Sequence, residues 1–167
     1  MWLYSLCHPL GFIFTVGAFI TIIGSNSGAP TSPALIRDSK SLVDFAMFIS
    51  CLSDHWFTDF LDYGCYCGFD GGGTPVDDID RCCKAHDECY ALIQEECGSL
   101  SPYLLPYSAT CGMGFKRSLP AHCYPPSSYW LEGRCRYNLC ECDRRAAECF
   151  TTGKYNLTYF AYDQRLC

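Results

Sequence analysis

Residues 80–90 of the chain read Asp-Arg-Cys-Cys-Lys-Ala-His-Asp-Glu-Cys-Tyr, so three cysteines surround a histidine within three helical turns. Cys82 and Cys89 are seven residues apart, which would place them on one face of a helix. Farther along the chain, Cys142 and Cys149 repeat this spacing. Two antiparallel helices with these faces turned inward could be joined twice, by Cys82 with Cys149 and by Cys89 with Cys142.

The sequence around these cysteines supports a helix at both places. Residues 74–78 read Thr-Pro-Val-Asp-Asp, which is typical of a capped helix N-terminus, and no further glycine or proline occurs before about Glu96. Residues 136–152 are likewise free of both. The sequence therefore predicts a mainly α-helical, disulfide-rich fold built on two long, antiparallel, disulfide-stapled helices.

Two titratable residues of the first helix are expected to face in different directions. His86 lies four residues after Cys82, on the stapled face, where Asp143 begins the matching face of the second helix. Asp87 lies four residues after Cys83 and shares the face of that cysteine instead. The pattern predicts a histidine turned toward the partner helix and a carboxylate turned toward the segment that Cys83 joins.

A glycine-rich loop precedes the first helix. Residues 66–73 read Tyr-Cys-Gly-Phe-Asp-Gly-Gly-Gly, and a bridge between Cys67 and Cys83 would hold this loop beside Asp87. Glycines let backbone carbonyls converge on an ion, and Ca²⁺ prefers such oxygen ligands together with a carboxylate. The alternatives are a plain loop beside a structural histidine, or zinc bound by the clustered cysteines, although their spacings lack two clean ligand pairs.

The cysteine content indicates the compartment. The chain has 167 residues and 18.8 kDa, with 49% hydrophobic and 18% charged residues, within the range of one globular domain. Of its 15 cysteines, 14 lie from Cys51 onward, an even number consistent with seven disulfides formed in an oxidising environment. From Ser41 onward the chain has 10 basic and 17 acidic residues, a formal charge of −7, which disfavours a nucleic-acid partner.

The N-terminal segment predicts a secreted, extracellular protein. Residues 10–23 form an uncharged apolar run followed by small and polar residues, the layout of a secretory signal peptide, with an uncleaved membrane anchor as the alternative. We expect a signal peptide over residues 1–27, a linker or short propeptide over residues 28–40 and a folded domain over residues 41–167. In a secreted chain, the sequon at Asn156 is usable for glycosylation if it is exposed.

Four motifs identify the chain with a known family. They read Tyr-Gly-Cys-Tyr-Cys-Gly at residues 63–68, Thr-Pro-Val-Asp-Asp-Ile-Asp-Arg-Cys-Cys at 74–83, His-Asp-Glu-Cys-Tyr at 86–90 and Cys-Glu-Cys-Asp-Arg-Arg-Ala-Ala-Glu-Cys-Phe at 140–150. Together they resemble the secreted phospholipase A2 family, over residues 41–167, with the seven-bridge pattern of its pancreatic and elapid-venom type. The resemblance implies the bridges Cys51–Cys111, Cys65–Cys167, Cys67–Cys83, Cys82–Cys149, Cys89–Cys142, Cys97–Cys135 and Cys123–Cys140.

The resemblance implies a calcium-dependent enzyme that hydrolyses the sn-2 ester of glycerophospholipids at lipid–water interfaces to lysophospholipid and free fatty acid. His86 would be the general base that takes a proton from a water, which then attacks the ester carbonyl directly. Asp143 would orient the imidazole and stabilise its charged form. Tyr90 and Tyr107 resemble the two tyrosines that hydrogen-bond this aspartate, and the Gly68 amide would complete the oxyanion hole.

The resemblance also implies a calcium site, formed by the backbone carbonyls of Tyr66, Gly68 and Asp70 and by the Asp87 carboxylate. Position 70 departs from the family, which usually has glycine there. Aspartate tolerates left-handed backbone angles better than most residues, so its carbonyl could still serve, and the extra carboxylate could strengthen cation attraction. If the loop needs a conformation open only to glycine, calcium affinity and activity both fall.

The implied partner is a phospholipid aggregate or membrane surface. Residues 41–50 carry apolar side chains at helical spacing and resemble the family's N-terminal helix, part of which meets lipid. Leu42, Phe57 and Phe69 are the candidates for an exposed interfacial rim. A small β-hairpin is expected within residues 111–135, and a receptor or partner protein is left open.

Two hypotheses from different classes follow. The first is a secreted, calcium-dependent phospholipase A2, and the second is a catalytically weak or inactive binding or scaffold protein with the same fold. His86, Asp87 and Asp143 favour the enzyme, whereas Asp70 favours the alternative. A disulfide-rich inhibitor or structural domain without lipid chemistry is disfavoured because the motifs occur together.

Overall fold

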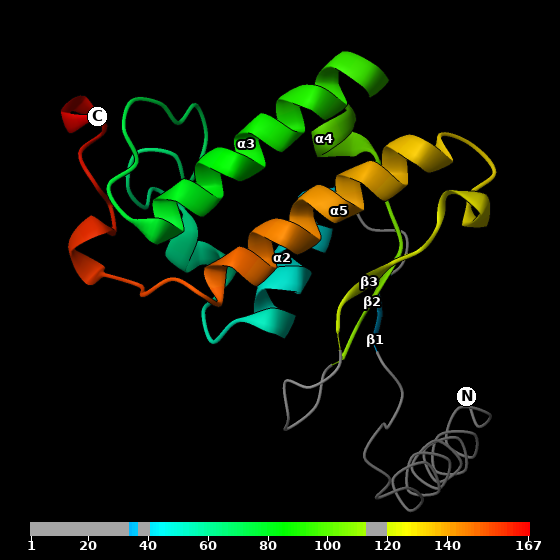
Figure 1. Cartoon of the computed structure of the whole chain (residues 1–167), viewed down its shortest axis with the longest axis horizontal. Helices are drawn as coiled ribbons and strands as arrows, with labels where there is room; N and C mark the ends of the chain where they lie inside the picture. The colour runs from blue at the N-terminus through cyan, green and yellow to red at the C-terminus, as the bar shows by residue number, and fades with distance from the viewer. Residues whose placement is uncertain (1–33, 37–40, 113–119) are drawn as a thin grey trace, which may run out of the picture. The chain divides into compact units, whose positions relative to one another are not determined.

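The computed structural model describes residues 34–36, 41–112 and 120–167 (Figure 1). The predicted signal peptide, residues 1–27, lies outside the described residues. In chain order the elements are β1 (Ala34–Ile36), α2 (Ser41–Leu52), η1 (Phe57–Phe60), α3 (Asp78–Cys97), α4 (Ser101–Leu104), β2 (Ala109–Cys111), β3 (His122–Cys123), η2 (Pro126–Ser128), α5 (Gly133–Phe150), η3 (Leu157–Tyr159) and η4 (Gln164–Leu166). None of the described helices combines the length and hydropathy that a membrane span requires.

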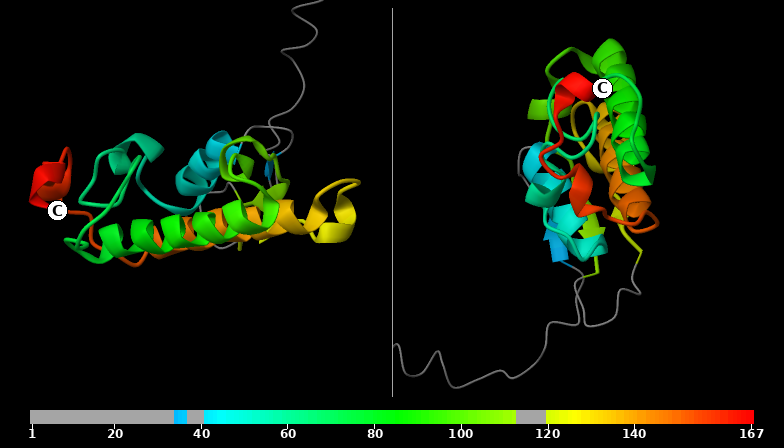
Figure 2. Two further views of the ribbon diagram at one scale, coloured as in Figure 1. Left: turned by 90° about the horizontal axis from the view of Figure 1, so that it is seen from above. Right: turned by 90° about the vertical axis from the view of Figure 1, so that its left-hand side faces the viewer.

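Helices α3 and α5 form the predicted antiparallel pair and lie side by side in Figure 1. Disulfides join Cys82 to Cys149 and Cys89 to Cys142, each with a Cα–Cα separation of 5.8 Å. The prediction drawn from the seven-residue spacing is therefore confirmed. Helix α2 packs against α5, and Figure 2 shows these helices from two further sides.

The N-terminus of α3 begins as predicted, whereas that of α5 begins earlier than predicted. Asp77 caps α3, because its side chain accepts a hydrogen bond from the Asp80 amide at 2.9 Å. Helix α5 begins at Gly133, three residues before the expected start at Arg136. Its first turn is hard to recognise from sequence, because glycine is a poor helix former and Glu132, in the N-cap position, makes no side-chain capping bond.

A small antiparallel sheet lies beside the helices, in the order β1-β2-β3. The expected hairpin is present, but its first strand begins at Ala109, two residues before the expected range, with Ala109 opposite Cys123 and Thr110 opposite His122. The third strand was not expected, since β1 lies within the segment predicted to be a linker or propeptide and pairs Leu35 with Thr110. A three-residue strand has no periodic signal of its own, so its existence depends on the β2 edge that it meets.

The other five disulfides tie the remaining segments to this core, with Cα–Cα distances between 5.0 and 6.3 Å. They are Cys51–Cys111, Cys65–Cys167, Cys67–Cys83, Cys97–Cys135 and Cys123–Cys140. All seven bridges implied by the resemblance are thus confirmed. Aromatic packing continues the core, and Phe60 stacks on Phe150 with ring centroids 4.2 Å apart.

Candidate active site

A histidine and a carboxylate meet between the stapled helices. The Nε2 atom of His86 lies 2.7 Å from Oδ1 of Asp143, and Asp143 is fully buried. His86 sits between Cys82 and Cys89 on α3, so both bridges hold its face against α5. The structure therefore brings these two predicted residues together in the way that their spacing suggested.

Two tyrosines complete the surroundings of the buried carboxylate. The Tyr90 hydroxyl donates to Oδ1 of Asp143 at 2.8 Å, and the Tyr107 hydroxyl donates to Oδ2 at 2.6 Å. Burial raises the pKa of Tyr107 well above its ordinary value, and the adjacent charge of Asp143 raises it further. Tyr107 consequently remains a hydrogen-bond donor throughout the physiological pH range. Both tyrosines lie where the resemblance implied.

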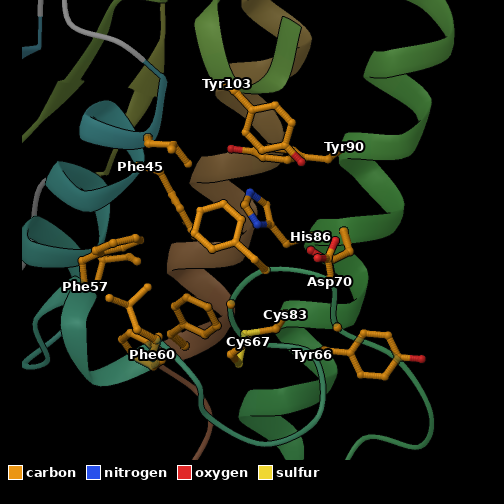
Figure 3. A pocket seen from close by; sticks show the side chains of 18 of the residues that line it. Phe45, Phe57, Phe60, Tyr66, Cys67, Asp70, Cys83, His86, Tyr90 and Tyr103 are labelled. Atoms are coloured by element: carbon orange, nitrogen blue, oxygen red, sulfur yellow. A yellow bond between two sulfur atoms is a disulfide. The ribbon is translucent and has the colours of Figure 1, made fainter. Parts of the chain in front are cut away.

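The imidazole faces a cavity of about 300 Å³. Since Nε2 is engaged by Asp143, Nδ1 is the ring nitrogen left for a water or a substrate. The Phe45 ring lies 4.3 Å from the imidazole, centroid to centroid, and restricts how the imidazole can turn (Figure 3). The apolar wall of the cavity comes from Leu42, Phe45, Ile49, Phe57, Phe60 and Phe150.

The glycine-rich loop forms the other side of this cavity. Tyr66, Gly68, Asp70 and Asp87 all line it together with His86, so the predicted metal-binding and catalytic residues share one site (Figure 3). The Cys67–Cys83 bridge ties the loop to α3, as expected. The loop is therefore tied to the helix that carries His86.

Asp80 organises this loop and was missed by the sequence analysis. Its buried carboxylate accepts hydrogen bonds from the backbone amides of Cys65 at 2.8 Å, Tyr66 at 2.7 Å and Val76 at 2.9 Å. A side chain on Gly64 would overlap that carboxylate, so glycine is required there. In sequence, Asp80 is only one of several acidic residues in the first turn of a helix, which are usually exposed.

The backbone at positions 68 and 70 bears on the departure from the family pattern. Gly68 has φ of +130°, a value that side chains rarely adopt, whereas Asp70 has φ of +59°, in the left-handed region that aspartate tolerates. Position 70 therefore does not require the glycine-only conformation. Aspartate is compatible with the observed loop.

The chemistry of the loop fits a hard divalent cation. Partial burial raises the pKa of the Asp87 carboxyl to about 6, because desolvation disfavours the charged form more than the neighbouring His86 favours it. Among the described residues, no group of three or more histidine, cysteine or acidic side chains is arranged to hold a metal. A cation beside Asp87 would therefore take most of its ligands from backbone carbonyls, which is a donor set that suits calcium.

The rim of the cavity differs in part from the prediction. Phe69 is 74% exposed, as expected for an interfacial residue. Leu42 and Phe57 are instead half-buried and line the cavity, because both turn toward the core side of α2 and η1. Trp56, beside Phe57, is 70% exposed and was not singled out, since no periodic pattern marks a residue in an irregular connection.

Three relatives and a family profile show what this chain is similar to. The profile is described as phospholipase A2 and matches residues 42–160. The chain is 39% identical over 127 residues to an acidic phospholipase A2 of Micrurus dumerilii, covering 76% of this chain and 99% of that protein. It is 37% identical over 123 residues to the basic phospholipase A2 nigroxin B of Micrurus nigrocinctus, covering 74% and 95%. A basic phospholipase A2 of Micrurus corallinus is 34% identical over 149 residues, covering 89% and 91%.

Proposed function

The chain belongs to the phospholipase A2 family of enzymes, and we propose that it is a secreted, calcium-dependent phospholipase that hydrolyses the sn-2 ester of glycerophospholipids at lipid–water interfaces. Its products are a lysophospholipid and a free fatty acid. The observation that carries this proposal is the His86–Asp143 pair at the wall of an apolar cavity, 2.7 Å apart and supported by two tyrosines. Seven disulfides support secretion, because such bridges persist in oxidising compartments.

The base is His86. Its Nδ1 takes one proton from a water, whose oxygen attacks the sn-2 carbonyl carbon, and the same proton then passes to the leaving alkoxide of the glycerol backbone. Asp143 holds the Nε2 proton and stabilises the imidazolium while it exists. No acyl-enzyme is formed, and the chain contains no Gly-x-Ser-x-Gly sequence to supply a serine nucleophile.

The loop would hold the metal through the carbonyls of Tyr66, Gly68 and Asp70 and through the Asp87 carboxylate. A bound calcium ion supplies polarisation of the ester carbonyl and attraction for the substrate phosphate. The Gly68 amide donates to the developing oxyanion. Asp80 keeps the start of this loop in place through its three backbone hydrogen bonds.

The acyl chain would occupy the apolar part of the cavity. Six of its apolar residues come from α2, η1 and the end of α5, and a volume of about 300 Å³ accommodates the ester and the first part of a chain. Phe69 and Trp56, at the exposed edge, are suited to the interfacial region of a lipid layer.

A second candidate function is a binding or scaffold protein of this fold with little or no catalysis. The observation that favours it is Asp70, which replaces the usual glycine of the family in the loop. The left-handed backbone at this position allows a carbonyl to be presented, but the added carboxylate alters the charge of the site.

The experiment is hydrolysis of phosphatidylcholine with different sn-1 and sn-2 chains, in mixed micelles, by the protein that eukaryotic cells secrete from the full-length chain. The proposal predicts release of the sn-2 fatty acid alone, and loss of release when calcium is chelated. An inactive, correctly bridged protein at millimolar calcium would reject the enzyme and favour the scaffold.

A further inference from the structure

The charged side chains around the cavity are acidic. Asp70 and Asp87 line it, and no lysine or arginine is among the described lining residues. Lys84 lies close to the loop, but its ammonium is placed over the Tyr66 ring, 5.5 Å from the ring centroid, and it is not part of the lining. No lysine or arginine of the lining would therefore balance an anion that enters the site, and that role would fall mainly to a cation held by the loop.

Asp70 is available for a ligand. It lies between Phe69 and Gly71 in the loop and is exposed. Within the described part of the chain, its carboxylate makes no hydrogen bond or ion pair. Figure 3 shows it among the side chains around His86. Its side chain branches from the Cα next to the carbonyl that is proposed to face the cation, so it starts close to the proposed metal site.

The charges on a bound phospholipid determine which headgroup Asp70 favours. This inference rests on the proposed function. A divalent cation carries two positive charges, which Asp87 and the substrate phosphate balance between them. Asp70 then remains as one uncompensated negative charge. An ammonium on the headgroup neutralises it, whereas a neutral or anionic headgroup leaves it unbalanced.

We propose that Asp70 is a specificity-determining residue. It favours phospholipids whose headgroup carries a cationic group, such as choline or ethanolamine, over phospholipids with net negative charge. Exposed ion pairs change free energies by less than about 1 kcal/mol, so the preference that depends on Asp70 is about two- to fivefold. Salt weakens it, because both charges are near solvent.

The test is competition between phosphatidylcholine and phosphatidylglycerol with identical acyl chains, in equal amounts in neutral detergent micelles, at calcium that saturates each variant. Asp70→Asn keeps the left-handed backbone and removes the charge. It should lower the ratio of choline to glycerol lysolipid by about two- to fivefold at low salt, and by less at high salt. Asp62→Asn is the matched control, since Asp62 is also exposed with φ of +57° but does not line the cavity.

An unchanged ratio in Asp70→Asn, or an equal shift in Asp62→Asn, would overturn the inference. Hydrolysis of neither lipid by the wild type would instead contradict the proposed function. In that case a binding measurement still tests the role of Asp70. Calorimetry should show that the wild type binds monomeric dodecylphosphocholine more tightly than dodecylphosphoglycerol, and that this difference in affinity is smaller in Asp70→Asn. Equal affinities in the wild type would reject the inference by this second route.

A different observation concerns the sequon Asn156-Leu-Thr at η3. Asn156, Leu157 and Thr158 are all exposed, and Leu157 is 79% exposed. The Asn156 Oδ1 accepts a hydrogen bond from the Thr158 amide at 3.0 Å, and within the described residues its Nδ2 makes no hydrogen bond. None of the three lines the cavity around His86.

We infer that Asn156 carries an N-linked glycan in the secreted protein, since a glycan on its free Nδ2 would extend into solvent and cover the exposed Leu157. The test is intact mass of the secreted full-length product before and after peptide-N-glycosidase F. A mass loss in the wild type, absent from Asn156→Gln and from Thr158→Ala, is expected. A wild-type mass equal to that of the bare polypeptide would overturn the assignment.

Discussion

At the scale of single residues, Asp143 receives hydrogen bonds from three side chains in a fully buried position. His86 Nε2, the Tyr90 hydroxyl and the Tyr107 hydroxyl lie 2.6 to 2.8 Å from its two oxygens. Burial of a carboxylate is costly unless its oxygens are hydrogen-bonded, and here both are. The network therefore stabilises a negative charge next to His86, where the proposed mechanism forms an imidazolium.

Asp143→Asn tests this role. The amide keeps the shape of the carboxylate but removes its negative charge, so the imidazolium loses its stabilising partner and hydrolysis should slow by about tenfold or more. The measurement is kcat on mixed micelles, with far-ultraviolet circular dichroism to confirm the fold. Asp163→Asn is the control, because Asp163 is paired with Arg165 at the surface. Equal rates in the wild type and Asp143→Asn would contradict the assigned role.

Asp80→Asn tests the anchoring of the loop. An amide nitrogen would face backbone N–H groups that now donate to a carboxylate, so at least one bond is lost. We expect the free energy of unfolding to fall by about 1–3 kcal/mol and calcium binding to weaken. Chemical denaturation and calcium titration calorimetry measure the two effects. Asp78→Asn, at a side chain that is 73% exposed, should change neither.

At the scale of elements, helical periodicity accounts for what the sequence could predict. Two cysteine pairs at seven-residue spacing predict a stapled pair of helices, and with it the facing of His86 and Asp143, from local geometry alone. The Cys51–Cys111 bridge joins α2 to β2 across 60 residues and no helical spacing relates its two cysteines, so this pairing could be inferred only from the family resemblance. Strand β1 and the loop contacts of Asp80 depend on tertiary packing, which no local pattern records.

The loop staple offers a prediction at this scale. Replacing Cys67 and Cys83 by alanine removes a bridge that spans 16 residues, which should lower stability by about 3 kcal/mol and weaken calcium binding, because the loop is no longer held to α3.

The matched control is removal of the bridge between Cys97 and Cys135. It spans 38 residues, neither cysteine lines the cavity, and its loss should lower stability by about 4 kcal/mol while calcium affinity is unchanged. Thermal unfolding and calcium titration calorimetry distinguish the two variants. Equal calcium affinity in both would show that the staple does not shape the loop.

At the scale of the whole molecule, the proposed contact with lipid must rest on apolar groups because the protein is acidic. The chain has a formal charge of −6, so net charge does not attract it to anionic membranes. Trp56 and Phe69 supply exposed aromatic surface at the edge of the cavity-lining segments. The proposed lipid contact would therefore depend on these particular side chains more than on overall electrostatics.

Trp56→Ser tests this contact. Serine suits the N-cap position before η1, so the fold should be kept while an aromatic group is lost from the lipid interface. We expect about tenfold weaker binding to phosphatidylcholine vesicles and unchanged hydrolysis of a monomeric short-chain substrate. Vesicle sedimentation measures the binding, and an assay on the monomeric substrate measures the hydrolysis. Trp130→Ser, which removes a tryptophan that is 98% exposed and lies outside the lining of the cavity around His86, should affect neither. Vesicle binding by the Trp56 variant equal to that of the wild type would contradict the prediction.

The most direct test of the account is the comparison of His86→Gln with the wild type on phosphatidylcholine whose two acyl chains differ in mass, at saturating calcium. If His86 activates the attacking water, the wild type releases only the sn-2 fatty acid. The variant should then lose activity by about 10²-fold or more with its seven disulfides and calcium affinity intact. Comparable sn-2 release by a folded His86→Gln protein would contradict the account.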